Sequence, residues 1–483
     1  MSVMQDNCCR TEPRIGSPVT NLLLSSTLPQ YISMSQNRHN YVLPNYRGKK
    51  WVCAELPTQG QTWQIGKRHS SGKELPSRQA MVDALAQSTQ FNDWQWPDST
   101  IYFMADPHAD TEAFLASLVA SGGIQKTGPE DDDFKLTKAG AKASFIIGGD
   151  CLDKGPSNLR LLRSIRHLMN EGANVRLLAG NHDLRLLLGI RAMGMRRDPK
   201  TEHFFLRMGP KVVPLLKEVH EEYLKGRNLL RHIPSSDECK RRLYPSDRWF
   251  DEFPRYAQWV MSERAVEREL SRIKKKYERF EQVCEEAGLS MRKVYATARK
   301  CQELFFEKNS EFYWFYNTMQ LAHREGSFLF IHAGIDDRIA KVIEDKGIEH
   351  LNKLYRRQIK NDLFEFYYGP LANTIRTKYR VFDMPLTQIG VDRVYRYGIQ
   401  AIVQGHRNRR QGQRLKLRKG LVHIESDTTM DCNSRQKEGL DGKGFGVTIL
   451  RPKGQVIGIS ADYPYAKFFE LNNLILQNIK HDL

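Results

Sequence analysis

Residues 145–155 read FIIGGDCLDKG, and this stretch decides how the chain should fold. Its first three residues are apolar, as is typical of a short buried strand, and the two glycines that follow turn the chain out of that strand. Asp150 and Asp153 then stand just beyond the strand end. Since ligand-binding groups of α/β proteins collect at the carboxyl ends of strands, the stretch predicts an α/β fold with a polar site at one edge of a sheet.

Four further segments repeat this pattern of an apolar strand followed by residues that can bind metals. They supply Asp106 and His108, then Asn181 and His182, then His332, and finally His406. Taken singly, each segment would more often be a surface loop or a helix cap, but five in order argue against coincidence. Carboxylates and imidazoles clustered in this way suit divalent ions such as Mn, Fe and Zn. The sequence therefore predicts a metal site at the shared edge of these strands.

The chain divides into parts that differ in pattern. Residues 1–98 are rich in Ser, Gln, Asn, Pro and Gly, which predicts a partly ordered N-terminal arm. Strand and helix patterns alternate over residues 99–190 and again over 321–465, as expected of a layered α/β domain. Residues 191–320 are charged and helical in pattern and predict an α-helical insert. Residues 466–483 are predicted to form a C-terminal helix.

Composition limits the kinds of protein that this chain can be. The 483 residues include 74 Lys and Arg against 56 Asp and Glu, for a formal net charge of +18, and 40% are hydrophobic. That apolar share is ample for a buried core. The positive charge favours anionic partners, nucleic acid included, although a solvated basic surface explains it equally well.

Two further features bear on the compartment of the protein. No apolar run approaches the ~18 residues that cross a bilayer, so no membrane partner is expected. The eight cysteines are scattered without the regular spacing of a disulfide framework, which fits reduced thiols in the cytoplasm. We therefore expect a cytoplasmic protein.

In their order along the chain, the motifs Asp-x-His, Gly-Asp-x-x-Asp-x-Gly, Gly-Asn-His-Asp, His-Ala-Gly and Gly-His resemble those of the calcineurin-like metallophosphoesterase superfamily. Within it, the sequence is most similar to the phosphoprotein-phosphatase, or serine/threonine phosphatase, type. The resemblance covers residues 99–190 and 321–465. It implies that these residues form a catalytic domain built as a four-layer sandwich, with two mixed β-sheets flanked by helices and interrupted by the insert.

The resemblance also implies a site with two divalent ions, either Mn, Fe or Zn. Asp106 and His108 would bind the first ion, Asp150 would bridge both ions, and Asn181, His332 and His406 would complete the second. Such a pair of ions clamps a phosphate and holds a bridging hydroxide, which would attack phosphorus directly. His182 matches the general acid of the family, and Asp153 matches the carboxylate that orients its imidazole.

The sequence departs from the family pattern where phosphate is gripped. Lys154 stands where the family has an arginine, and a lysine supplies charge without the two-pronged hydrogen bonding of a guanidinium. Lys154 remains a candidate phosphate-binding residue. Arg407, together with Arg409 and Arg410, could supply the missing contact or could belong to the basic surface. In addition, the third motif ends in Asp183 instead of the usual Glu.

The last motif separates the branches of the superfamily. Nucleases and cyclic phosphodiesterases usually carry Gly-His-x-His, whereas here Asn408 takes the place of the second histidine. We therefore expect hydrolysis of phosphomonoesters, on phosphoserine or phosphothreonine proteins or on phosphorylated small molecules. Cleavage of phosphodiesters in nucleotides or nucleic acid is an alternative that the net charge encourages. A scaffold that retains the fold without turnover is a third, which the complete motif set disfavours.

The insert enters the chain between the third and fourth motifs, so its ends should lie near the metal site. We expect it to act as a cap that restricts which phosphates reach the ions. His423, which precedes Glu425 and Asp427 on a late strand, could also line the site, although a structural histidine is the simpler interpretation.

Overall fold

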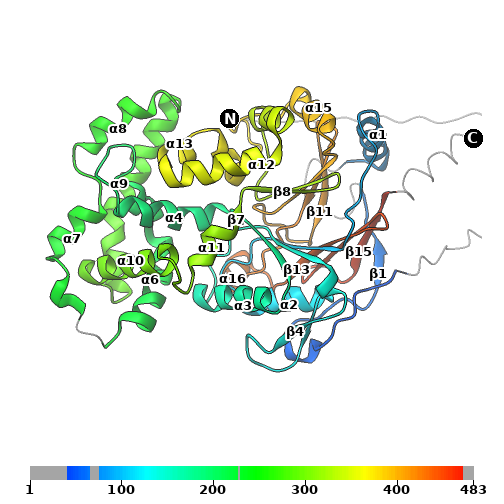
Figure 1. Cartoon of the computed structure of the whole chain (residues 1–483), viewed down its shortest axis with the longest axis horizontal. Coiled ribbons are helices and arrows are strands. Elements are labelled where there is room, and N and C mark those ends of the chain that lie inside the picture. The colour runs from blue at the N-terminus through cyan, green and yellow to red at the C-terminus, as the bar shows by residue number, and fades with distance from the viewer. Residues whose placement is uncertain (1–40, 66–75, 227–228, 472–483) are drawn as a thin grey trace, which may run out of the picture. The chain divides into compact units, whose positions relative to one another are not determined.

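The computed structural model describes residues 41–65, 76–226 and 229–471 of the chain. These residues belong to one compact unit that begins at Tyr41. Within it, two mixed sheets lie toward one end, and the helices between residues 204 and 306 gather at the other (Figure 1). Mixed sheets flanked by helices confirm the predicted α/β fold class.

The larger sheet has eight strands in the order β1-β15-β14-β13-β2-β5-β6-β7. Their bounds are β1 Gly60–Thr62, β2 Ile101–Met104, β5 Ser144–Ile147, β6 Asn174–Leu178, β7 Met319–Gln320, β13 Gly446–Arg451, β14 Gln455–Ser460 and β15 Ala466–Glu470. The strands β2, β5, β6 and β7 are parallel, whereas β13 pairs with both β2 and β14 in antiparallel fashion. Strand β2 thus lies between β5, with which it pairs in parallel, and β13, with which it pairs in antiparallel fashion.

The second sheet has five strands in the order β11-β12-β10-β9-β8. Their bounds are β8 Ala322–Glu325, β9 Phe328–Ile331, β10 Ala401–Gln404, β11 Arg414–Arg418 and β12 Leu421–Glu425. Strands β9, β10 and β12 run parallel, and β11 and β8 close the two edges in antiparallel fashion. A separate hairpin pairs β3 Ile124–Lys126 with β4 Phe134–Leu136.

The two sheets pack face to face because side chains alternate along each strand. Ile101 and Phe103 of β2 point into a core shared with the second sheet, where the rings of Phe103 and Phe330 lie 5.8 Å apart. Tyr102 and Met104 point the other way and pack with the helices that cover the outer face. Every residue of β2 is buried as a result, which explains its continuous apolar sequence.

Helices cover both outer faces. Those before the insert are α1 Arg78–Thr89, α2 Thr111–Ser121, α3 Asn158–Asn170 and α4 Asn181–Met193. Those after it are α12 Asp337–Asn361, α13 Leu363–Tyr368, α14 Asn373–Arg376, α15 Gln388–Arg396 and α16 Cys432–Glu438. No helix in the described ranges is both long enough and apolar enough to span a membrane.

The segment predicted to be an insert is mostly helical in its described residues. It contains α5 Phe204–Met208, α6 Val213–Val219, α7 Ser236–Leu243, α8 Trp249–Ala257, α9 Glu263–Glu286, α10 Met291–Phe306 and α11 Tyr313–Thr318. Residues of this segment such as Phe205 and Phe280 belong to the same hydrophobic core as Leu162 of α3 and Leu186 of α4. The insert is therefore packed into the core, and its role as a cap stays a prediction.

The two ends of the chain depart from simple expectation. In the N-terminal arm, β1 pairs with β15, and Trp63, Met81 and Leu85 reach the core between the sheets. The segment predicted to be a C-terminal helix begins instead as strand β15. The backbone N–H and C=O groups along the edge of β14 need partners, and an extended strand supplies them whereas a helix would not. Residues 1–40, 66–75 and 472–483 lie outside the described residues, so the order of the arm and the rest of that helix stay predictions.

Candidate metal centre

The predicted ligands come from five strand ends in two different sheets. Asp106 and His108 follow β2, Asp150 follows β5, Asn181 and His182 open α4 after β6, His332 follows β9, and His406 follows β10. The carboxyl ends of these strands meet where the two sheets pack together, so the fold gathers residues up to 300 positions apart. The structure brings these seven residues together at that edge.

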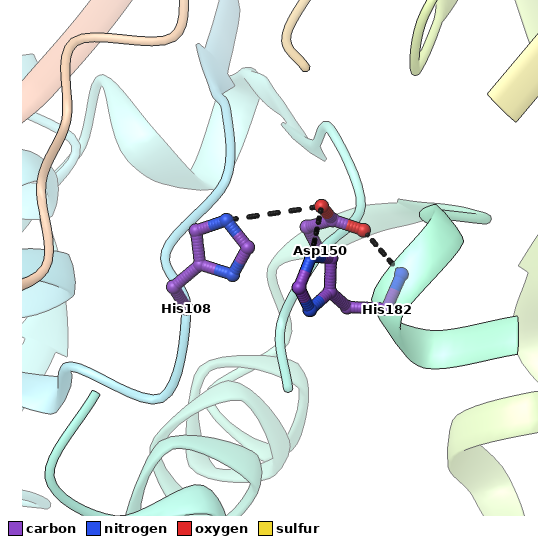
Figure 2. Close-up of side chains that lie close together, drawn as sticks. All are labelled: His108, Asp150 and His182. Carbon is purple, nitrogen blue, oxygen red and sulfur yellow. Dashed lines mark hydrogen bonds and ion pairs between the residues drawn. The ribbon is translucent and has the colours of Figure 1, made fainter. Parts of the chain in front are cut away.

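Asp150 lies at the middle of this cluster. Its Oδ2 atom is 3.7 Å from Nε2 of His108 and 3.9 Å from Nε2 of His182. Figure 2 shows the side chains of His108 and His182 on either side of the Asp150 carboxylate. Its Oδ1 atom is 3.6 Å from Nε2 of His332. Asp150 thus belongs to two groups of candidate ligands, one with His108 and His182 and one with His332 and His406. Within each group, the possible ligand atoms lie within 4.8 Å of one another. A carboxylate shared between two groups is the arrangement expected of a bridging ligand.

Asp106 and Asn181 complete the two groups. The Asp106 carboxylate lies 3.9 Å from Nε2 of His108 and accepts a hydrogen bond from the backbone N–H of His406 at 3.0 Å. One atom of the Asn181 amide group lies 3.4 Å from Nε2 of His332 and 2.9 Å from Nδ1 of His406. The side chains of Asp106 and Asn181 therefore border the two groups.

Unusual backbone geometry makes this gathering possible. Asp106, His108, Asp150 and His406 all have positive φ, between 43° and 64°, a region that costs a non-glycine residue about 1–2 kcal/mol. Gly180 lets two ligand loops touch, because a Cβ there would lie 2.0 Å from the backbone nitrogen of Asp150. Non-glycine residues held in this region tend to cluster at active sites, and here they coincide with the predicted ligands.

Asp183, the last residue of the third motif, holds the loop that carries Asp150. Its buried carboxylate accepts hydrogen bonds from the backbone N–H groups of Asp150, Cys151 and Leu152 at 2.7, 2.8 and 3.0 Å. Burial, with a smaller contribution from the neighbouring Asp150 carboxylate, raises the pKa of Asp183 to about 8. Asp183 thus shapes the loop without joining the candidate ligands, a role that its place in the motif did not reveal.

The predicted acid and its partner are in contact. Nδ1 of His182 lies 2.8 Å from Oδ2 of Asp153, and the backbone N–H of Asp153 donates to Oδ1 of Asn158 at 2.9 Å. Burial lowers the pKa of His182, while the carboxylates of Asp150 and Asp153 act against it. Arg185, which the sequence analysis did not single out, lies 3.3 Å from the same Asp153 oxygen.

The donor set fits divalent cations. Burial and the neighbouring carboxylates of Asp427 and Asp150 raise the pKa of Asp106 well above its usual value, as expected of acidic groups gathered without a counter-charge. In addition, Nε2 of His406 and Oδ2 of Asp427 are buried without a hydrogen-bond partner. Borderline cations such as Mn, Fe or Zn would satisfy these nitrogen and oxygen atoms together.

The two candidate phosphate-binding residues lie differently. Nζ of Lys154 is 2.6 Å from Nε2 of His108, so its charge is at the centre. Nη1 of Arg407 instead lies 3.3 Å from Oε1 of Glu425, which turns it toward a separate group of arginines. The late-strand histidine, His423, is fully buried on β12, with Nδ1 3.3 Å from the side-chain oxygen of Gln404.

Part of the chain matches the model of a known protein family. Residues 99–279 match the family model described as calcineurin-like phosphoesterase. The match starts at β2 and runs into the insert, so it includes the first three motifs and stops before His332 and His406. No curated protein sequence matches the chain.

Among solved structures, the chain is similar to a cold-active protein tyrosine phosphatase, with 15% identity, a TM-score of 0.41, and coverage of 86% of this chain and 90% of that one. It is similar to a protein serine/threonine phosphatase from Saccharomyces cerevisiae, with 12% identity, a TM-score of 0.34, and coverage of 82% and 90%. A putative diadenosine tetraphosphatase also matches, with 13% identity, a TM-score of 0.27, and coverage of 76% and 97%.

Proposed function

Since residues 99–279 match the calcineurin-like phosphoesterase family model, we propose that the chain is a metal-dependent phosphatase that hydrolyses phosphomonoesters. The observation that carries the proposal is the position of Asp150, whose two carboxylate oxygens face different groups of histidines. Two divalent ions held there, of Mn, Fe or Zn, would draw in phosphate oxygens and lower the pKa of water. In this proposal the metal ligands are Asp106, His108, Asp150, Asn181, His332 and His406.

Two residues of the chain deal with the leaving group. The hydrogen bond from Nδ1 of His182 to Asp153 fixes the ring and favours its protonated form. Nε2 then faces the centre, since it lies 3.9 Å from Oδ2 of Asp150, and can donate its proton to the oxygen that leaves phosphorus. Lys154, beside His108, adds positive charge for the phosphate.

Phosphorylated proteins and small molecules are both compatible substrates in this proposal. Phosphoserine and phosphothreonine proteins are one class, as the sequence resemblance implies. Hydrolysis of phosphodiesters in nucleotides or nucleic acid is the competing activity, favoured by the net charge of +18. A cytoplasmic location is part of the proposal, supported by the free cysteines among the described residues.

The test is hydrolysis of p-nitrophenyl phosphate beside bis-(p-nitrophenyl) phosphate, with Mn added or chelated. We expect turnover of the monoester that requires metal, is abolished in Asp150→Asn and is unchanged in Asp345→Asn, a matched change at an exposed aspartate of α12. Faster turnover of the bis ester would favour the phosphodiesterase. Metal binding without turnover of either ester would favour a scaffold.

A further inference from the structure

Beside the candidate metal centre, four arginines converge on one carboxylate. Nη2 of Arg409, Arg414 and Arg418 lie 2.6, 2.7 and 2.9 Å from the carboxylate oxygens of Glu425, and Nη1 of Arg407 lies at 3.3 Å. We call these five residues the arginine cluster. Glu425 ends β12, and Arg414 and Arg418 lie on the neighbouring β11, so the fold fixes the arrangement.

The charges of the arginine cluster do not balance. Burial alone would raise the pKa of Glu425, but the four guanidinium groups outweigh it and hold that pKa at about 2, so the carboxylate is ionised. One carboxylate against four guanidinium groups leaves three positive charges uncompensated within the cluster. The side chain of Glu425 is fully buried, and those of the arginines are only 11–21% exposed. Crowding like charges with little access to water is costly unless an anion is present.

The hydrogen bonding of the arginine cluster also indicates that an anion is needed. A carboxylate has about four acceptor sites, whereas each guanidinium has five N–H groups to satisfy. Accordingly, Nε of Arg409 and Nε of Arg418 are buried without a hydrogen-bond partner. Buried donors without partners are rare in folded proteins and often mark the place of an ion or a water.

The arginine cluster lies next to the metal centre in the chain and in space. Arg407 directly follows His406, and Asp427 is two residues beyond Glu425, within roughly 7 Å along the backbone. The ring of Tyr379 stacks on the Arg418 guanidinium at 4.2 Å, and its hydroxyl accepts a hydrogen bond from the backbone N–H of Ile335, just after the His332 motif. A molecule with one phosphate at the metals could therefore reach the cluster with a second anionic group.

From this geometry we propose that the arginine cluster is an oxyanion-binding subsite that takes a phosphate group other than the one hydrolysed. Planar guanidinium groups bind phosphate oxygens through paired hydrogen bonds, and several of them around one anion are typical of phosphate recognition. The phosphate could be a second group on the substrate, which rests on the proposed function, or a free anion that acts as an effector. Binding itself requires neither turnover nor metal.

The first experiment measures binding of inorganic sulfate to the full-length, chelator-treated protein by calorimetry. We expect saturable binding that weakens at least tenfold in Arg409→Gln and less than twofold in Arg410→Gln. Arg410 is exposed in the same loop and forms no ion pair within the described part of the chain, so it is a matched control. Equal affinity in wild type and Arg409→Gln, or equal losses in both variants, would overturn the proposal.

A second variant guards against misfolding. If Arg409→Gln does not fold, Arg409→Lys keeps the charge but loses the paired geometry, and weaker sulfate binding in it than in wild type is still required. Unchanged binding in a folded Arg409→Lys would then contradict the proposal.

A second experiment distinguishes a second substrate phosphate from a free anion. It measures KM for fructose 6-phosphate, which has one phosphate, and for fructose 1,6-bisphosphate, which has two. A KM that rises in Arg409→Gln for the bisphosphate alone identifies a second substrate phosphate. Loss of sulfate binding with both KM values unchanged identifies a free anion. If neither sugar is turned over, the phosphate of these sugars is not the source of the anion; the sulfate measurement still decides the subsite, and p-nitrophenyl phosphate tests the proposed function separately.

Discussion

The carboxylate of Glu218, on helix α6 of the insert, accepts a hydrogen bond from the backbone N–H of Asn158 at the start of α3, 2.9 Å away. It also accepts from the backbone N–H of Leu159 at 3.0 Å, so it caps a helix to which it does not belong. Asn158 in turn accepts from the backbone N–H of Asp153. The insert is thereby linked through one residue to Asp153, whose carboxylate contacts Nδ1 of His182.

This link predicts a combined effect on stability and rate. Glu218→Ala should lower the free energy of unfolding by about 1 kcal/mol, as expected for loss of a helix cap. It should also lower kcat several-fold with KM unchanged, because Asp153 loses part of its support. Denaturant unfolding and steady-state kinetics measure the two effects. Glu221→Ala, at an exposed position of the same segment, should change neither, and an equal loss there would contradict the link.

Replacement of His182 should affect substrates according to their leaving groups. A general acid contributes roughly 10²–10⁴-fold when the leaving oxygen needs a proton. His182→Asn should therefore lower kcat by that order for a phosphoserine peptide but far less for p-nitrophenyl phosphate, whose phenolate leaves readily. Equal losses on the two substrates would indicate that His182 acts in metal binding instead, which its distance to Asp150 also allows.

Because His203 is buried in the insert, we expect the stability of the protein to fall in acid. Burial is the main reason that the pKa of this ring falls to about 3, and the ring packs against Trp249 with Nε2 2.8 Å from the Tyr368 hydroxyl. Arg207 and Lys276 lower that pKa further, while Glu269 opposes them.

Because the unfolded chain takes up a proton near pH 6.5 and the folded chain does not, stability should fall as the pH drops from 6.5 toward 3. Between pH 7.5 and 4.5, the loss attributable to His203 is about 2–3 kcal/mol. Denaturant unfolding at the two pH values should show this loss reduced in His203→Gln relative to wild type. The exposed His232, changed to Gln, should leave the pH dependence as it is.

Removal of the Glu425 carboxylate should expose the charge imbalance of the arginine cluster. Glu425→Gln leaves four poorly solvated guanidinium groups without their counter-charge, and breaking a buried ion pair in this way costs about 3–5 kcal/mol. We expect a lower melting temperature that sulfate raises more in the variant than in wild type. A variant as stable as wild type in the absence of anions would contradict this account.

Local sequence was enough to predict the strands that carry the ligands. Around Asp150, the apolar run, the glycines and the polar residues all lie within eleven positions, and the order of the motifs indicated the remaining candidate ligands. The strand β15 was misassigned to a helix. Its partner β1 has three residues and lies far away in the sequence, and its pairing with the nearby β14 cannot be recognised from local sequence.

Contacts between distant side chains were also beyond prediction. Nothing near Glu218 in the sequence indicates that its carboxylate caps α3, since the two lie about 60 positions apart. Likewise, Arg407 was considered for phosphate at the metals, but its contact with Glu425 depends on the packing of β10 beside β12. Such pairings arise only when the strands have found their neighbours.

The order of the strands has a consequence for how the protein is made on the ribosome. Asp106 and His406 are 300 positions apart, and at about 5–20 residues per second the ribosome needs roughly 15–60 s to pass from one to the other. Strand β13, which pairs with β2 beside Asp106, emerges later still. The nascent chain must therefore keep the open edge of β2 from aggregating until its partner arrives, and any ion that all the candidate ligands hold together enters only after His406 has been made.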